Sequence, residues 1–236
     1  MQTLALLWEN LPLLLLGLQA TLLIAAVTLV ASTVLGVAVG TLATLRPRWL
    51  RLVAGLYVET FRDIPLIVTV FAIFFGAPFL GVPLAPVPSV VLGLSLWGGA
   101  NGAEIVRGGI RAVPKGQAEA ATALGLHLWK TYLLVLWPQA LRSVLPAYTG
   151  LLALIIQSTS LGALVGVTEF LKAGGLIIER STVMQGINPA FGIYTAVLLT
   201  YFAVCSLLTA LSRRLERRLN TGRVHRGPVL PNAAAV

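Results

Sequence analysis

The chain has 236 residues, of which 57% are hydrophobic and 11% are charged. Soluble domains carry roughly 25% charged residues, so this composition excludes an ordinary soluble domain and predicts a surface that lies mostly in lipid or against other subunits. The net charge of +9 does not indicate nucleic-acid binding, because the basic residues stand in short clusters beside apolar stretches and no basic face is interleaved with aromatic side chains.

The first apolar stretch, residues 11–45, contains no charged residue and is longer than the roughly 20 residues that cross a bilayer. We therefore predict an interfacial lead-in over 11–18 and a membrane helix over 19–45. A basic cluster over 46–51 follows, and Pro47 within it ends the helix because proline lacks the backbone N–H that a helix interior needs.

A second membrane span is predicted within residues 52–80, although this stretch contains charged residues and a proline. Glu59 and Arg62 stand one helical turn apart and could form an ion pair, and Asp63 lies beside them. Pro65 leaves two alternatives, which are one long helix or a helix that breaks at this proline.

Three further spans are predicted over residues 89–110, 141–167 and 190–211. An uncharged, proline-rich connection over 81–88 precedes them, and the loop over 169–180 balances two acidic against two basic residues. Most of the remaining Lys and Arg residues lie in the other connections and in the C-terminal end. Since cytoplasmic loops are enriched in Lys and Arg, we predict five spans with the N-terminus outside and the C-terminus in the cytoplasm of a plasma (in bacteria, inner) membrane.

The predicted cytoplasmic connection between the third and fourth spans contains a polar segment over 113–138 that is rich in small residues. We expect a short exposed helix, whose small residues allow another protein to approach its backbone closely. Glu119 near the start of this helix is favoured by the helix dipole. We expect Gly125 to stop or bend the helix and Pro138 to separate the segment from the next span.

Within this segment, Glu119-Ala120-Ala121 is followed after three residues by Gly125 and after nine more by Val-Leu-Trp-Pro over 135–138. This spacing resembles the EAA motif of bacterial ABC importer permeases, with Val and Trp where the motif has Ile and Leu. Further stretches are similar to those of the histidine/glutamine/glutamate-type permeases for polar amino acids. They are residues 61–66, 103–110, 113–117 and 138–142.

The resemblance implies an all-α polytopic membrane protein with five transmembrane helices and a cytoplasmic coupling helix, which is the type I ABC importer permease fold. We expect this domain over 11–219 and a disordered cytoplasmic tail over 220–236. In the family, the coupling helix docks into a groove on a separate ATP-binding subunit. The residues that the resemblance assigns to this docking are Lys115, Gly116, Gln117, Glu119, Ala120, Ala121, Gly125 and Pro138.

The partners that the resemblance implies are two copies of the ATP-binding subunit, a second permease subunit that is identical or homologous, and an extracytoplasmic substrate-binding protein. The chain has no G-x-x-x-x-G-K-[ST] loop, so ATP must bind to the partner chain. We therefore expect a permease that is not itself an enzyme and holds no cofactor.

Polar side chains inside apolar spans are expensive unless they are functional or paired, so they are candidates for the substrate path. Structural alternatives exist, because Glu104 could pair with Arg107 one turn away, and Ser and Thr in membrane helices often bond their own backbone. The candidates are Asn101 and Glu104 on the third span and Gln157, Ser158 and Thr159 on the fourth.

The fourth span also departs from the family pattern. Many members have Lys-Asp-Thr-Ser-Leu where this chain has Gln-Ser-Thr-Ser-Leu over 157–161, so two charged side chains are replaced by neutral ones. The loss of the aspartate disfavours a cationic substrate. We expect a polar or acidic amino acid rather than a basic one.

Three other functions remain as alternatives. The first is an ABC permease for another small, amino-acid-like solute. An ion-coupled secondary transporter would require acidic residues near mid-span, which the fourth and fifth spans lack. An intramembrane enzyme or metal site is disfavoured because the histidines, His127 and His225, lie in the coupling connection and in the tail.

Overall fold

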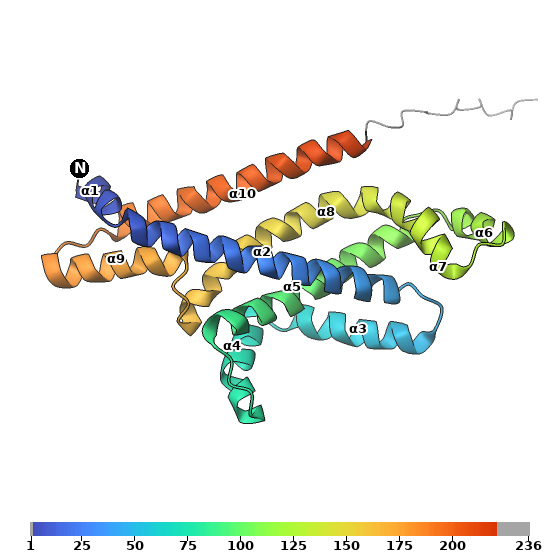
Figure 1. The fold of residues 1–236 in the computed structure, drawn as a ribbon, viewed down its shortest axis with the longest axis horizontal. Helices are drawn as coiled ribbons and strands as arrows, with labels where there is room; N and C mark the ends of the chain where they lie inside the picture. The colour runs from blue at the N-terminus through green and yellow to red at the C-terminus, as the bar shows by residue number, and fades with distance from the viewer. Residues whose placement is uncertain (1, 221–236) are drawn as a thin grey trace, which may run out of the picture.

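The computed structural model describes residues 2–220, and over this range the chain folds into helices without a strand. The molecule is elongated, with α6 and α7 at one end and α1 and α9 at the other (Figure 1). The helices are α1 Gln2–Glu9, α2 Leu11–Leu42, α3 Arg48–Asp63, α4 Leu66–Gly76, η1 Ala77–Leu80, α5 Pro86–Arg111, α6 Lys115–Ala123, α7 Leu128–Thr131, the π-helical turn η2 Tyr132–Leu136, α8 Trp137–Ser158, η3 Thr159–Val165, α9 Phe170–Gln185 and α10 Ala190–Asn220.

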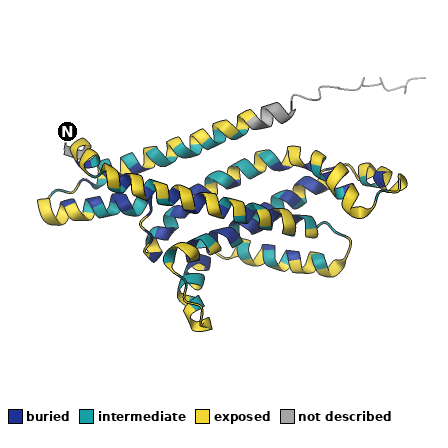
Figure 2. Cartoon of the chain, in the orientation of Figure 1, coloured by how far each residue is buried: buried dark blue, intermediate teal, exposed yellow. Residues whose placement is uncertain are grey.

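The helices account for the five predicted membrane spans. Three stretches are long and apolar enough to cross a membrane, namely Leu11–Leu42, Leu128–Val165 and Ala190–Arg214, and the bent pair α3–α4 adds a fourth. The fifth is α5, whose 26 residues reach about 39 Å. Because α5 is the most enclosed helix of the bundle (Figure 2), its glycines and charged residues do not have to face lipid.

The second span is broken at the proline, as one of the two alternatives from the sequence predicts. The axes of α3 and α4 differ by 100°. Ile64 and Pro65 both adopt extended backbone angles between the two helices. The bend leaves α3 beside the second half of α5 and places α4 against its first half, where Val70 packs on Gly93.

Four sequence predictions were wrong. Glu119 does not lie near the start of its helix, because it is the middle residue of α6 Lys115–Ala123, whose first turn has no acidic residue. Residues 11–18 are not a separate interfacial lead-in, because Pro12 occupies the first helical turn, where it is tolerated, and α2 continues to Leu42. Pro138 does not separate the coupling segment from the next span, since it lies in the first turn of α8, which follows α7 and η2 directly. The predicted loop 169–180 is mostly the helix α9, which is capped by the Glu169 side chain.

The remaining boundaries differ less. Helix α10 continues past the predicted end at residue 211 to Asn220. The fourth span ends its α-helix at Ser158, and η3 occupies most of the stretch up to residue 167. Apart from Asn220, the predicted tail over 220–236 lies outside the described residues.

Helices α2 and α5 pack closely and run parallel. A Cβ atom on Gly36 would lie 3.0 Å from the backbone carbon of Gly102, and one on Gly40 would lie 2.5 Å from the Ala103 carbonyl oxygen. Small residues at such positions let membrane helices approach closely enough for backbone van der Waals contact. This contact fixes α5 against the first span.

We expect Gly40→Ala to destabilise the subunit by about 1–3 kcal/mol, because the added methyl overpacks the contact with Val106 and Ala103. Gly55→Ala is the matched control, since nothing lies within 4 Å of the position of its Cβ atom. The thermal midpoint of the purified subunit in detergent measures both. Equal midpoints for the two variants would contradict the packing described here.

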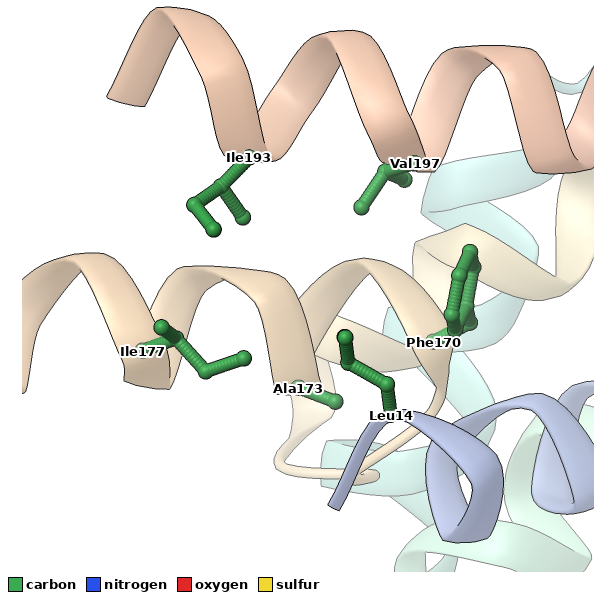
Figure 3. Packing of buried hydrophobic residues seen from close by; sticks show 6 residues of the cluster. All are labelled: Leu14, Phe170, Ala173, Ile177, Ile193 and Val197. Atoms are coloured by element: carbon green, nitrogen blue, oxygen red, sulfur yellow. The ribbon is translucent and has the colours of Figure 1, made fainter. Parts of the chain in front are cut away.

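Buried apolar clusters hold the ends and the middle of the bundle. At the α1–α9 end, one cluster joins α2, α9 and α10 (Figure 3). Its members are Leu14, Phe170, Ala173, Ile177, Ile193 and Val197. A second cluster in the middle includes Val70, Val90 and Val165, and a third joins α5, η2 and α8 next to the coupling segment.

Candidate coupling segment and substrate path

The expected short helix of the coupling segment is α6, at one end of the molecule (Figure 1). Gly125 has a φ of +76°, a left-handed conformation that L side chains rarely adopt. The Gly125 N–H donates to the Thr122 carbonyl at 2.9 Å and the Leu126 N–H donates to the Ala121 carbonyl at 3.0 Å. These two bonds form a Schellman motif, which stops the helix where the sequence predicts.

Most of the predicted coupling residues point outward. Ala121 is the exception, because it is buried at 3% exposure and attaches α6 to the rest of the chain. The exposed ones are Lys115, Gly116, Gln117, Glu119, Ala120, Gly125 and Pro138. Leu124 beside the glycine is 83% exposed, so the tip of the segment presents an apolar side chain. A partner surface that covers α6 would bury this side chain.

The coupling segment is anchored to several spans. Beneath it, Val113 and Leu136 belong to the cluster that includes Val106 of α5 and Val144 of α8. The Gln139 amide of α8 donates to the Gln117 side-chain oxygen at 3.2 Å. The segment is therefore in direct contact with the start of the fourth span.

A charged cavity of about 290 Å³ lies between α3 and α5. Its lining includes Glu59, Arg62 and Glu104. The predicted pair between Glu104 and Arg107 is present: the Arg107 Nε donates to Glu104 Oε2 at 2.8 Å, and a second contact joins Nη2 to Oε1. Among the residues whose side chains are described, it is the only ion pair, so the alternative pair of Glu59 with Arg62 is not formed.

The other residue proposed on the third span does not line this cavity. The side chain of Asn101 is half-buried and donates to the Trp97 carbonyl at 2.9 Å, one turn back on its own helix. Glu104 and Asn101 thus share a helix, but only Glu104 faces the charged cavity.

Gln157 and Glu104 line different cavities. Gln157 is exposed at the end of α8, and its amide lies 3.9 Å from the sulfur of Cys205 on α10. It borders a cavity of about 330 Å³ with Ser160, Tyr194 and Tyr201. This region lies near the middle of the first span, because the preceding Ile155 packs where Ser32 of α2 meets α5.

The neighbouring residues differ in accessibility. Ser158 is half-buried at the last position of α8. Thr159 is fully buried, and its hydroxyl donates to the Ile156 carbonyl at 2.8 Å. Thr159 therefore bonds the backbone of its own chain segment, which is the structural role that the sequence analysis gave as the alternative to lining the substrate path.

A buried carboxylate that sequence reasoning missed lies at the start of α9. Glu169 is completely buried, and its oxygens accept hydrogen bonds from the backbone N–H groups of Leu171 and Lys172 at 2.9 and 2.8 Å. The Tyr201 hydroxyl donates to Glu169 Oε2 at 2.9 Å. The bonds tie α9 to α10. An acidic residue just before an apolar periodic stretch is an N-cap signal that could have identified it.

The first span joins the same network. The Thr21 hydroxyl oxygen accepts the Phe170 N–H at 3.1 Å, and its side chain is 1% exposed. Helices α2, α9 and α10 are therefore connected by polar contacts as well as by the apolar cluster of Figure 3.

The chain matches a known family model over residues 32–221, the binding-protein-dependent transport system inner membrane component. It is 33% identical over 210 residues to a probable amino-acid ABC transporter permease protein, YckA, of Bacillus subtilis, covering 89% of this chain and 90% of that one. It is 34% identical over 214 residues to the glutamine transport system permease protein GlnP of Escherichia coli, with 90% and 95% covered.

Solved structures have the same fold. The chain is similar to an amino acid ABC transporter crystallised with histidines, with a TM-score of 0.79, 25% identity, and 90% of this chain and 96% of that one covered. The MetNI methionine ABC transporter in an inward-facing conformation gives a TM-score of 0.72 at 24% identity, with 88% and 96% covered.

Proposed function

Because the chain belongs to the family of binding-protein-dependent transport system inner membrane components and is an amino-acid ABC importer permease, we propose that it couples to a separate ATPase through residues 113–138. Two ATP-binding subunits dock on α6 and its equivalent in a second, identical or homologous permease. An extracytoplasmic binding protein delivers the substrate. This subunit supplies the path through the membrane and its partner supplies ATP hydrolysis.

The observation that carries this proposal is the form of α6. It is a short helix at the extreme end of the bundle, it ends in a glycine-dependent turn, and it has an exposed outer face over a buried attachment. When the ATP-binding subunits close, they displace α6. The bond from Gln139 to Gln117 and the apolar cluster beneath pass that displacement to α8 and α5.

The orientation follows from charge. The α6–α7 end of the molecule carries Lys115 and Lys130, and Arg111 ends α5 beside it. The excess of Lys and Arg on cytoplasmic loops supports a cytoplasmic position for this end. The N-terminus and α9 are then outside, and the importer domain extends over residues 11–219.

For the substrate, we favour a polar or acidic amino acid. We propose that the path passes Glu104 on α5 and Gln157 and Ser158 on α8. Glu104 and Gln157 each border a cavity, and Asn101 and Thr159, whose side chains bond the backbone, support the path. On α8, neither Gln157 nor Ser158 offers a carboxylate to a cationic side chain, and on α5 the Glu104 carboxylate is already paired with Arg107. In the importer, the second permease faces this region and completes the path.

Uptake by the complete complex in liposomes tests the proposal. With its binding protein and ATP-binding subunit present, ATP-dependent uptake of radiolabelled glutamate or glutamine should exceed uptake of arginine. Ser158→Asp should raise arginine uptake relative to glutamate by about threefold, a modest electrostatic effect. Ser158→Asn is the control of equal size without the charge. A wild-type preference for arginine would overturn the substrate class, and no ATP-dependent uptake would overturn the function.

A further inference from the structure

One hydrogen bond connects the coupling segment to the first span. The Tyr132 hydroxyl lies 3.0 Å from the Thr44 hydroxyl, across 88 residues of sequence. Thr44 also donates to the Thr41 carbonyl at 2.7 Å. Since a hydroxyl has one hydrogen to donate, the Tyr132 hydroxyl is the donor in the bond between the two side chains.

The two residues occupy special positions. Tyr132 is the first residue of η2, the π-helical turn between α7 and α8, and its ring packs against the apolar cluster beneath α6. Thr44 lies two residues past the end of α2, in the turn before α3. Both side chains are half-buried. π-Helical turns inside α-helical segments occur frequently at functional sites.

Helix α2 extends from this bond to the opposite end of the molecule. Its 32 residues form one uninterrupted helix of about 48 Å. Near its start, Gly17 packs against Ala173 and Phe170 of α9, and Thr21 accepts the Phe170 N–H. The Thr44 hydroxyl and N–H both bond the Thr41 carbonyl in the last turn of α2, so this helix is a continuous connection from Thr44 to the network around Glu169.

We infer that Tyr132 and Thr44 are positioning residues for coupling: their bond makes α2 follow the coupling segment when the ATP-binding subunits close. The inference rests on the proposed function. Displacement of α6 reaches α8 through Gln139 and α2 through Tyr132, so both ends of the path change together. Neither hydroxyl touches the substrate. Their bond changes the ratio of substrate taken up to ATP hydrolysed.

The test measures uptake and ATP hydrolysis together in the reconstituted complex. Tyr132→Phe and Thr44→Val should each lower the ratio of uptake to ATP hydrolysed about threefold, in line with the net strength of one hydrogen bond. The double variant should be no worse than either single one, because both remove the same bond. Thr44→Ser keeps the hydroxyl and should restore the ratio.

Thr41→Val is the matched control, because its hydroxyl donates to the Val37 carbonyl of its own helix at 2.7 Å, near the same end of α2. It should leave the ratio unchanged. Uptake and ATP hydrolysis that fall in proportion would overturn the inference, since the bond would then only support docking. Fully additive losses in the double variant would also overturn it. Absence of uptake in the wild type would instead refute the proposed function.

Discussion

Replacement of Gly125 by tryptophan is expected to lower uptake at least about tenfold while the subunit remains folded and inserted in the membrane. Nothing lies within 4 Å of the position of its Cβ atom, so the added side chain starts in open space. In the proposed complex, the indole meets the surface of the ATP-binding subunit that docks on α6. A tenfold effect corresponds to about 1.4 kcal/mol, which is small for a bulky side chain forced into a protein interface. Uptake and ATP hydrolysis by the reconstituted complex measure the result.

The φ of +76° at Gly125 adds backbone strain to any substitution, and two variants separate strain from bulk. Gly125→Ala adds the strain with only a methyl group and should lose much less activity. Gly81→Trp is the matched control, because Gly81 has a φ of +78°, also lies in open space, and belongs to the predicted outer connection. Undiminished uptake in Gly125→Trp would count against docking at this site, as would an equal loss in Gly81→Trp.

Replacement of Glu169 by alanine is expected to destabilise the subunit by about 3 kcal/mol or more. The change leaves the N–H groups of Leu171 and Lys172 and the hydroxyl of Tyr201 without their acceptor inside a buried site. Each buried donor left unpaired costs about 1–3 kcal/mol. The thermal midpoint of the purified subunit in detergent should therefore fall by several degrees, and the amount of inserted protein should fall with it.

Glu179→Ala is the matched control for this prediction, because Glu179 is an exposed carboxylate on the same helix. It should change the midpoint little. Tyr201→Phe removes one of the three bonds to Glu169 and should give an intermediate loss of about 1 kcal/mol. Equal midpoints for Glu169→Ala and Glu179→Ala would show that the buried network does not hold α9 and α10.

Much of this architecture follows from local chemistry in the sequence. The length of the apolar stretches predicts the spans, since the bilayer thickness is constant. Pro65 made a break between α3 and α4 one of two alternatives, because proline has no N–H to donate and restrains the residue before it, and the break is the one that is present. The spacing of small residues up to Gly125 predicts α6 and its end. In each case the cause lies within a few residues of its effect.

The same local reasoning was wrong where packing decides. Pro138 is compatible either with the first turn of a helix or with a break between helices. Because η2 leads directly into α8, the chain has no break there and Pro138 lies in the first turn of α8. The loop prediction over 169–180 weighed charges alone and overlooked that Glu169 caps a helix whose apolar face lies against α2 and α10. A balanced set of charges does not distinguish an exposed loop from a helix.

The sequence by itself determined the family, the membrane spans and the short helix α6, because hydrophobic length, proline, glycine and motif spacing act locally along the chain. Only the tertiary structure decided that Glu104 and Gln157 line separate cavities, that Glu169 bonds to Tyr201, and that Tyr132 reaches Thr44. Those contacts join residues far apart in sequence. These contacts depend on how the helices pack, and the pattern of residues along the chain does not indicate which side chains will be in contact.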